Sequence, residues 1–190
     1  RSHNVAHRDF WPFYEECAKQ GVAVAFHASG SDTLDPLGHF ENFLQIHTCS
    51  HAPEQLLACT AVIYSGLLEK YRDLRVAFLE AGIGWVPFWM EHMDEEYEFR
   101  GEWDAPSLTK KPSEYITSKN IFVACEPEER LLPETMRLIG SDCVVFASDY
   151  PHWDGSFPDS LFELEGREDL TDEQKHQILI DNPKRLYGLK

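Results

Sequence analysis

Four short apolar segments recur along the chain, and each is followed by an ionisable residue. They lie near residues 22–26, 74–79, 120–125 and 143–148, and they lead into His27, Glu80, Glu126 and Asp149. Segments with helical features separate them, and this alternation of strands and helices predicts an α/β fold with a parallel sheet. Because parallel neighbours place their carboxyl ends at one edge of a sheet, we expect the four ionisable side chains to share a site.

The stretch from residue 144 to residue 155 shows the pattern most clearly. An apolar run there ends abruptly in Asp149, Tyr150, Pro151 and His152. Taken singly, Asp149 is typical of an N-cap or a turn beside a proline, and His27 of a hydrogen-bonded structural histidine. Four such strand ends together favour a site. Histidine and carboxylates without a thiolate suit a divalent metal such as zinc or manganese, which lowers the pKa of a bound water or polarises a carbonyl.

Composition narrows the class of protein. With 190 residues, 43% of them hydrophobic, the chain suits one globular domain with a real core. Its formal net charge of -16 argues against a nucleic-acid or anionic-membrane partner. Five widely spaced cysteines without a Cys-x-x-Cys pair indicate neither a disulfide framework nor a thiolate zinc site, and they predict a reduced, cytoplasmic compartment. No apolar run approaches the roughly 18 residues of a membrane span.

The segments between the strands carry helix signals and one long connection. We expect helices at residues 9–20, 53–71, 130–140 and from 171 onward, and another that begins near Trp85. The polar connection at 31–50 is predicted to form a lid over the site. His47 and His51 have the spacing of a helical metal pair, but Pro53 follows, so the pattern favours a solvated surface. The excursion at 101–119 either covers the site or makes an oligomer contact.

Six motifs follow one another along nearly the whole chain. They occupy residues 24–27, 78–85, 111–115, 125–129, 148–152 and 182–188. In this order they resemble the amidohydrolase superfamily (amidohydrolase family 2), in the branch related to aminocarboxymuconate-semialdehyde decarboxylase. The resemblance implies a metal-dependent (β/α)8 TIM barrel. It implies that His27 is the metal ligand of strand five. It also implies that Asp149 is the ligand of strand eight, which transfers protons to or from the metal-bound water or the substrate.

The chain departs from that family at two points. Many relatives place a second histidine at strand six, where this sequence has Glu80, which could be a substitute ligand, a general acid/base or a partner of the ligands. No first strand with a His-x-His motif precedes His27. By this alignment residues 1–190 form a single partial domain, the C-terminal half (strands five to eight) of a TIM barrel that takes roughly 250 residues when complete. We expect such a half barrel to self-associate or to pair with the missing N-terminal half.

The function implied by the resemblance is hydrolysis or decarboxylation of a small carboxylated substrate at one divalent metal, zinc or manganese, which the fragment could lack. We expect Asp149 and Glu80 to serve catalysis and His27 and Asp149 to bind the metal. The residues expected on the substrate side are His152, Trp153, Trp85 and Glu126, although the spacing of Trp85 and Trp89 favours core packing. The alternative is a non-catalytic half-barrel fragment or interaction module, because two secure ligands are fewer than the three usual at catalytic zinc sites.

Overall fold

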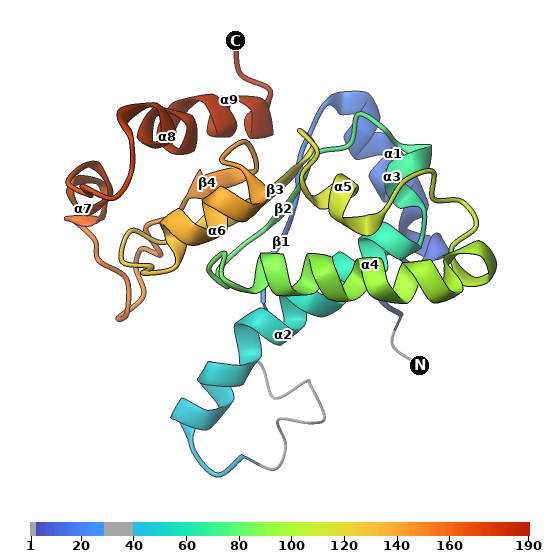
Figure 1. Ribbon diagram of the computed structural model, residues 1–190, viewed down its shortest axis with the longest axis horizontal. Helices are drawn as coiled ribbons and strands as arrows, with labels where there is room; N and C mark the ends of the chain where they lie inside the picture. Colours follow the sequence, from blue (N-terminus) through green and yellow to red (C-terminus); the bar gives the residue numbers. More distant parts are fainter. Residues whose placement is uncertain (1–2, 29–39) are drawn as a thin grey trace.

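A four-stranded parallel sheet forms the centre of the computed structural model, which describes residues 3–28 and 40–190. The strands are β1 (Val24–Phe26), β2 (Val76–Phe78), β3 (Ile121–Cys125) and β4 (Val144–Phe146), and they lie side by side in chain order (Figure 1). All three neighbouring pairs are parallel. The predicted strands and the predicted α/β class with a parallel sheet are therefore confirmed.

The two faces of the sheet differ. Side chains alternate along each strand, so Val76 and Phe78 enter the main hydrophobic core while Ala77 points to the opposite face. Helices α2, α4 and α6 contribute their buried side chains to the main core. The opposite face carries a small cluster made of Ala77, Phe122, Ala124, Val145 and Leu186. Helices thus cover mainly one face, which is how the wall of a barrel is built.

Helices occupy every connection between the strands. The described helices are η1 (Arg8–Phe10), α1 (Trp11–Gln20), α2 (Phe43–Tyr64), α3 (Leu67–Lys70), α4 (Trp85–Asp104), α5 (Pro112–Ile116), α6 (Leu132–Ile139), α7 (Ser160–Glu165), α8 (Asp172–His176), the π-helical η3 (Gln177–Asp181) and α9 (Asn182–Tyr187). Gly21 ends α1 in the left-handed conformation, as its position predicts. Thr171 and Gln174 form the capping box expected at the start of α8.

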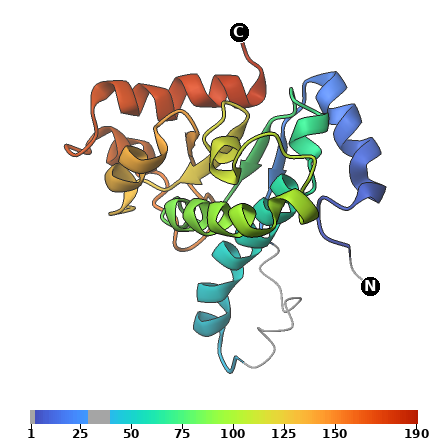
Figure 2. The same cartoon turned by 45° about the vertical axis from the view of Figure 1, so that its right-hand side comes forward.

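The observed bounds of helix α2 correct the predicted helix start at Pro53 and the predicted lid at residues 31–50. It begins at Phe43 rather than at Pro53, because the Asn42 side chain caps it by accepting a hydrogen bond from the Gln45 amide at 3.1 Å. Pro53 lies inside the helix. The predicted lid is therefore helical from Phe43 onward, and its residues 31–39 lie outside the described residues. The first turns of α2 extend beyond the body of the sheet (Figures 1 and 2).

Helix α9 closes the amino-terminal edge of the sheet. Arg75, just before β2, donates from Nε to the Leu186 carbonyl at 2.8 Å. Arg185 donates from Nε to the Lys119 carbonyl at 3.1 Å, and its guanidinium lies 5.1 Å from the centre of the Phe122 ring. These contacts tie the strand starts to the last helix, and they leave the carboxyl edge open for a site.

The described residues include no helix that is both long and apolar enough to cross a membrane. All five cysteines are free thiols in this structure.

Candidate functional site

Two acidic residues at the carboxyl edge of the sheet have a left-handed backbone. Glu80 comes shortly after β2 and Asp149 after β4, with φ values of 54° and 55°. This conformation costs about 1 kcal/mol or more for a residue with a side chain, so it persists only where the surroundings fix it. Only 12% of the Glu80 side chain and 18% of the Asp149 side chain are exposed. Both carboxylates are thus held inward at the edge where the sequence predicts a site.

Three imidazoles surround the Glu80 carboxylate. His27 Nε2 contacts its Oε2 atom, and His51 Nε2 lies 3.1 Å from its Oε1 atom. His152 Nδ1 lies 3.4 Å from Glu80 Oε1 and 3.4 Å from Asp149 Oδ1. The ends of β1, β2 and β4 and helix α2 each contribute at least one of these residues. Glu80 is therefore the centre of a histidine and carboxylate cluster.

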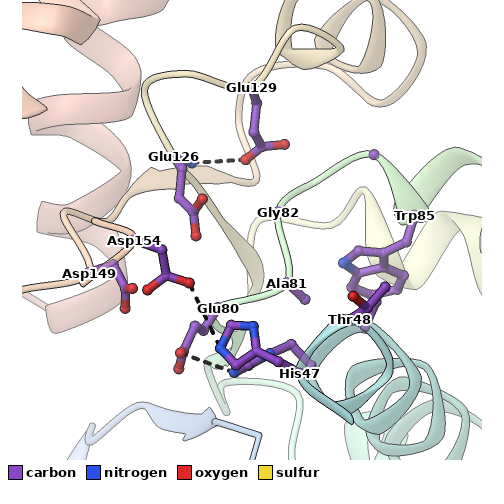
Figure 3. Close-up of a pocket in the computed structure, with 13 residues that line it drawn as sticks. His47, Thr48, Glu80, Ala81, Gly82, Trp85, Glu126, Glu129, Asp149 and Asp154 are labelled. Carbon is purple, nitrogen blue, oxygen red and sulfur yellow. Dashed lines mark hydrogen bonds and ion pairs between the residues drawn. The ribbon is translucent and has the colours of Figure 1, made fainter. Parts of the chain in front are cut away.

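The histidines of α2 correct the sequence analysis, which favoured a solvated surface for them. Their side chains are only 29% (His47) and 16% (His51) exposed. His47 Nε2 lies 3.8 Å from Asp154 Oδ2, and Figure 3 shows this pair beside Glu80. The prediction was wrong because α2 starts ten residues earlier than expected, at Phe43 instead of Pro53, which places both histidines on its first turns.

A pocket of about 470 Å³ opens at this edge of the sheet (Figure 3). Its lining consists of His47, Thr48, His51, Ala52, Glu80, Ala81, Gly82, Gly84, Trp85, Glu126, Glu129, Asp149 and Asp154. Five of these residues are acidic, two are histidines, and neither lysine nor arginine is among them. The described part of the pocket is therefore strongly acidic.

The residues expected on the substrate side do not all reach this pocket. Trp85 and Glu126 line it, and Trp85 also packs against the Phe78 ring with 6.1 Å between ring centres. His152 reaches the site through Glu80 and Asp149. The Trp153 side chain is not among the lining residues; the residue is 74% exposed, and its ring lies 5.9 Å from the His47 ring.

Burial and like charges raise the pKa values of the pocket acids. Burial raises the pKa of Glu126 to about 7, and the neighbouring carboxylates of Glu128, Glu129, Asp149 and Asp154 add to the shift. Burial also raises the pKa of Asp149, with a further contribution from Glu80, while His152 acts in the opposite direction. Glu126 is thus a carboxyl group that holds a proton near neutral pH.

Three side chains of the cluster offer a set of metal ligands. Ligand atoms of Glu80, Asp149 and His152 all lie within 4.8 Å of one another. Two carboxylates and an imidazole suit a hard or borderline divalent ion such as Mn²⁺ or Zn²⁺. His27, expected as a ligand, contacts Glu80 but is not in this group. A second group with ligand spacing, His3, His7 and Asp9, lies near the start of the chain.

Sequence reasoning overlooked several functional candidates. His51, Asp154 and Glu129 were not predicted as site residues, although all three line the pocket. The spacing of His47 and His51 was a usable signal for one of them. For Asp154 the sequence offers no local signal. Glu129 lies in the motif at 125–129, but its contact with the Ile83 amide depends on how two separate loops pack.

Comparisons with known proteins agree with this fold. A family profile described as amidohydrolase matches residues 2–189. The 2-amino-3-carboxymuconate-6-semialdehyde decarboxylase of Dictyostelium discoideum is 25% identical over 190 residues, which cover 98% of this chain and 50% of that protein. The chain thus spans about half the length of the curated relative it matches.

Two solved structures show the same arrangement. An amidohydrolase from Mycobacterium avium subsp. paratuberculosis superposes with a TM-score of 0.81 at 21% identity, covering 99% of this chain and 47% of that one. A 5-carboxyvanillate decarboxylase from Novosphingobium aromaticivorans, solved with bound manganese, has a TM-score of 0.78 at 17% identity, covering 98% and 54%. At these identities the likeness shows the fold.

Proposed function

The chain belongs to the amidohydrolase family, and from that premise we propose that it forms part of a metal-dependent hydrolase or decarboxylase of small carboxylated substrates. One observation carries the proposal: strand ends far apart in the sequence bring ligand atoms of Glu80, Asp149 and His152 within 4.8 Å of one another. The similarity to decarboxylases of carboxylated compounds supports the choice of reaction and substrate class.

In this proposal Asp149 holds the metal together with Glu80 and His152, and His27, which contacts Glu80, is a further ligand. The contact of Glu80 Oε2 with His27 and the short spacing of Glu80 and Asp149 support a shared ion. The bound manganese of the related carboxyvanillate decarboxylase supports a divalent ion, either Mn²⁺ or Zn²⁺. When bound, such an ion supplies Lewis-acid polarisation of a substrate oxygen and favours deprotonation of water.

The residues of the chain itself handle protons and orient the substrate. Asp149 Oδ1 and His152 Nδ1 lie 3.4 Å apart, so a proton can pass between them with a small movement. Across the pocket, Glu126 holds a proton near pH 7 and can donate a hydrogen bond to a substrate oxygen. Trp85 offers a flat apolar surface beside these groups.

We propose further that this sheet is the C-terminal half of the barrel. Strands β1 and β4 each pair on one side only within the described sheet, and the matched relatives are about twice as long. Strands from a further segment or a partner chain would complete the barrel and supply more metal ligands. The second candidate is an interaction module without catalysis, which these two open edges favour.

The metal content of the purified 190-residue chain, measured by elemental analysis after incubation with Mn²⁺ or Zn²⁺, tests the proposal. We expect about one ion per chain at this site, in line with single-metal catalytic sites, and its loss in His27→Ala. His7→Ala is the matched control, because it disrupts the separate group at His3, His7 and Asp9. Equal metal content in His27→Ala and the unaltered chain would contradict the metal assignment. A metal-free chain whose molar mass in solution exceeds that of one copy would favour the interaction module.

A further inference from the structure

The Glu129 carboxylate accepts hydrogen bonds from two turns that border the pocket. Its Oε2 atom accepts a hydrogen bond from the Ile83 amide at 2.9 Å, and its Oε1 atom accepts one from the Glu126 amide at 2.8 Å. Ile83 lies in the turn that follows Glu80, and Glu126 directly follows β3. One side chain therefore joins the loops that leave β2 and β3, beyond the point where the strands pair.

The turn after β2 lies close to this carboxylate. Gly82 has a φ of 60°, and a Cβ atom there would lie 2.9 Å from Glu129 Oε2 and 3.1 Å from its Cδ atom. Glycine provides both the left-handed conformation and the space for this approach. The Ile83 hydrogen bond thus depends on glycine at position 82.

Arg167 fixes the other side of the Glu129 turn. Its Nη1 atom donates to the Pro127 carbonyl at 2.6 Å and to the Glu129 carbonyl at 2.7 Å. The same guanidinium binds both oxygens of Asp169, at 2.9 and 2.7 Å. Because Arg167 holds the backbone and not the Glu129 carboxylate, both oxygens of that carboxylate remain available to the two amides.

We infer that Glu129 is a positioning residue, which sets the separation of Glu80 and Glu126 across the pocket by holding their two turns together. Figure 3 shows Glu129 joined to the Glu126 amide, with Glu80 at the end of the neighbouring strand. The inference rests on the proposed function for its consequence, because a displaced Glu80 would loosen its cluster with Asp149 and His152.

The test uses Glu129→Gln in the 190-residue chain, with Glu128→Gln as the matched control. Glutamine keeps the size of the side chain but replaces one acceptor oxygen with an NH₂ group, so one of the two amides loses its partner. Glu128 is exposed on the same turn, and its substitution removes the same charge. We expect hydrogen exchange at the Ile83 or Glu126 amide to rise about tenfold in Glu129→Gln only. We also expect its affinity for Mn²⁺ to fall about 10- to 100-fold, with the thermal midpoint within a few degrees of the control.

Each outcome separates this inference from the proposed function. If the unaltered chain binds no Mn²⁺, the proposed metal site fails, and amide exchange alone decides the role of Glu129. Exchange and Mn²⁺ affinity equal to those of Glu128→Gln would overturn the inference. If Glu129→Gln does not fold, Gly82→Ala replaces it: its methyl group displaces the turn from an intact Glu129, and faster exchange at Ile83 is expected again. Unchanged exchange in Gly82→Ala would likewise overturn it.

Discussion

Two glutamates near opposite edges of the sheet have different surroundings, and their pKa values shift in opposite directions. Glu69, in α3 near the starts of β2 and β3, accepts hydrogen bonds from the Thr109 and Tyr115 hydroxyls and from Arg72 Nη2, the last at 3.0 Å. These partners lower its pKa to about 2. Glu126, at the carboxyl end of β3, is surrounded by other acids, and its pKa rises to about 7.

This difference indicates that the amino-terminal edge contributes to stability. At the amino-terminal edge, hydrogen-bond donors and a cation match the carboxylate, so it stays charged and fixed. At the carboxyl edge, like charges and burial oppose ionisation, and Glu80 and Asp149 hold a left-handed backbone. Residues that lower stability locally persist where function needs them, and in barrel enzymes that edge is the carboxyl one.

The largest effect is expected for Asp149→Ala, which tests whether the carboxyl edge is functional. The substitution removes one carboxylate of the metal group and leaves the left-handed position to alanine, which adopts it at a small cost, so we expect Mn²⁺ affinity to fall by at least about 100-fold while the fold persists. If the chain takes part in catalysis as proposed, turnover should be lost as well. Calorimetric titration with Mn²⁺ and circular dichroism measure the two effects. An affinity within a few-fold of the unaltered chain would remove Asp149 from the site.

A smaller effect, on stability alone, is expected for Glu69→Ala at the amino-terminal edge. The substitution leaves the hydroxyls of Thr109 and Tyr115 without their acceptor, at a cost of about 2 kcal/mol. For a chain of this size that corresponds to a decrease of about 4–8 °C in the thermal midpoint. Mn²⁺ affinity should not change. Glu134→Ala, which removes an exposed pair with Arg137, is the control and should shift the midpoint by less than about 2 °C.

The sequence was sufficient to predict the sheet and the edge at which the candidate site lies. Continuous apolar runs identify buried parallel strands, and the ionisable residues that follow them must share an edge once the strands are parallel. Gly21 and Thr171 mark helix ends through local chemistry alone. These features depend on neighbours within a few positions, which is why they can be read without the structure.

The contacts around the pocket could not be predicted in the same way. Proline is common at helix starts, so the sequence analysis placed the start of this helix at Pro53. The helix begins at Phe43, because Asn42 caps it there. The approach of His51 to Glu80, and of Glu129 to Ile83, depends on how separate loops pack. No short-range pattern encodes such distances. The assignment to barrel strands five to eight stays a prediction.

The smallest effect is a difference in pH dependence between the two edges, measured on the metal-free chain. Glu69 has a folded pKa of about 2, below its ordinary 4.5, so it contributes stability that is present above pH 4.5 and lost as the pH falls toward 2. Glu126 has a folded pKa of about 7, so the folded state binds the extra proton between pH 4.5 and 7. Its contribution to stability therefore falls as the pH rises through that window.

Urea unfolding of Glu69→Gln and Glu126→Gln, with a chelator present, separates the two contributions. Relative to the unaltered chain, Glu69→Gln should flatten the stability curve below pH 4.5, and Glu126→Gln should flatten it between pH 4.5 and 7. The signs are opposite because one carboxyl is stabilised as an anion and the other as a neutral acid. If Glu126→Gln leaves the curve between pH 4.5 and 7 unchanged, Glu126 ionises normally, and the contrast between the two edges reduces to hydrogen bonding at Glu69.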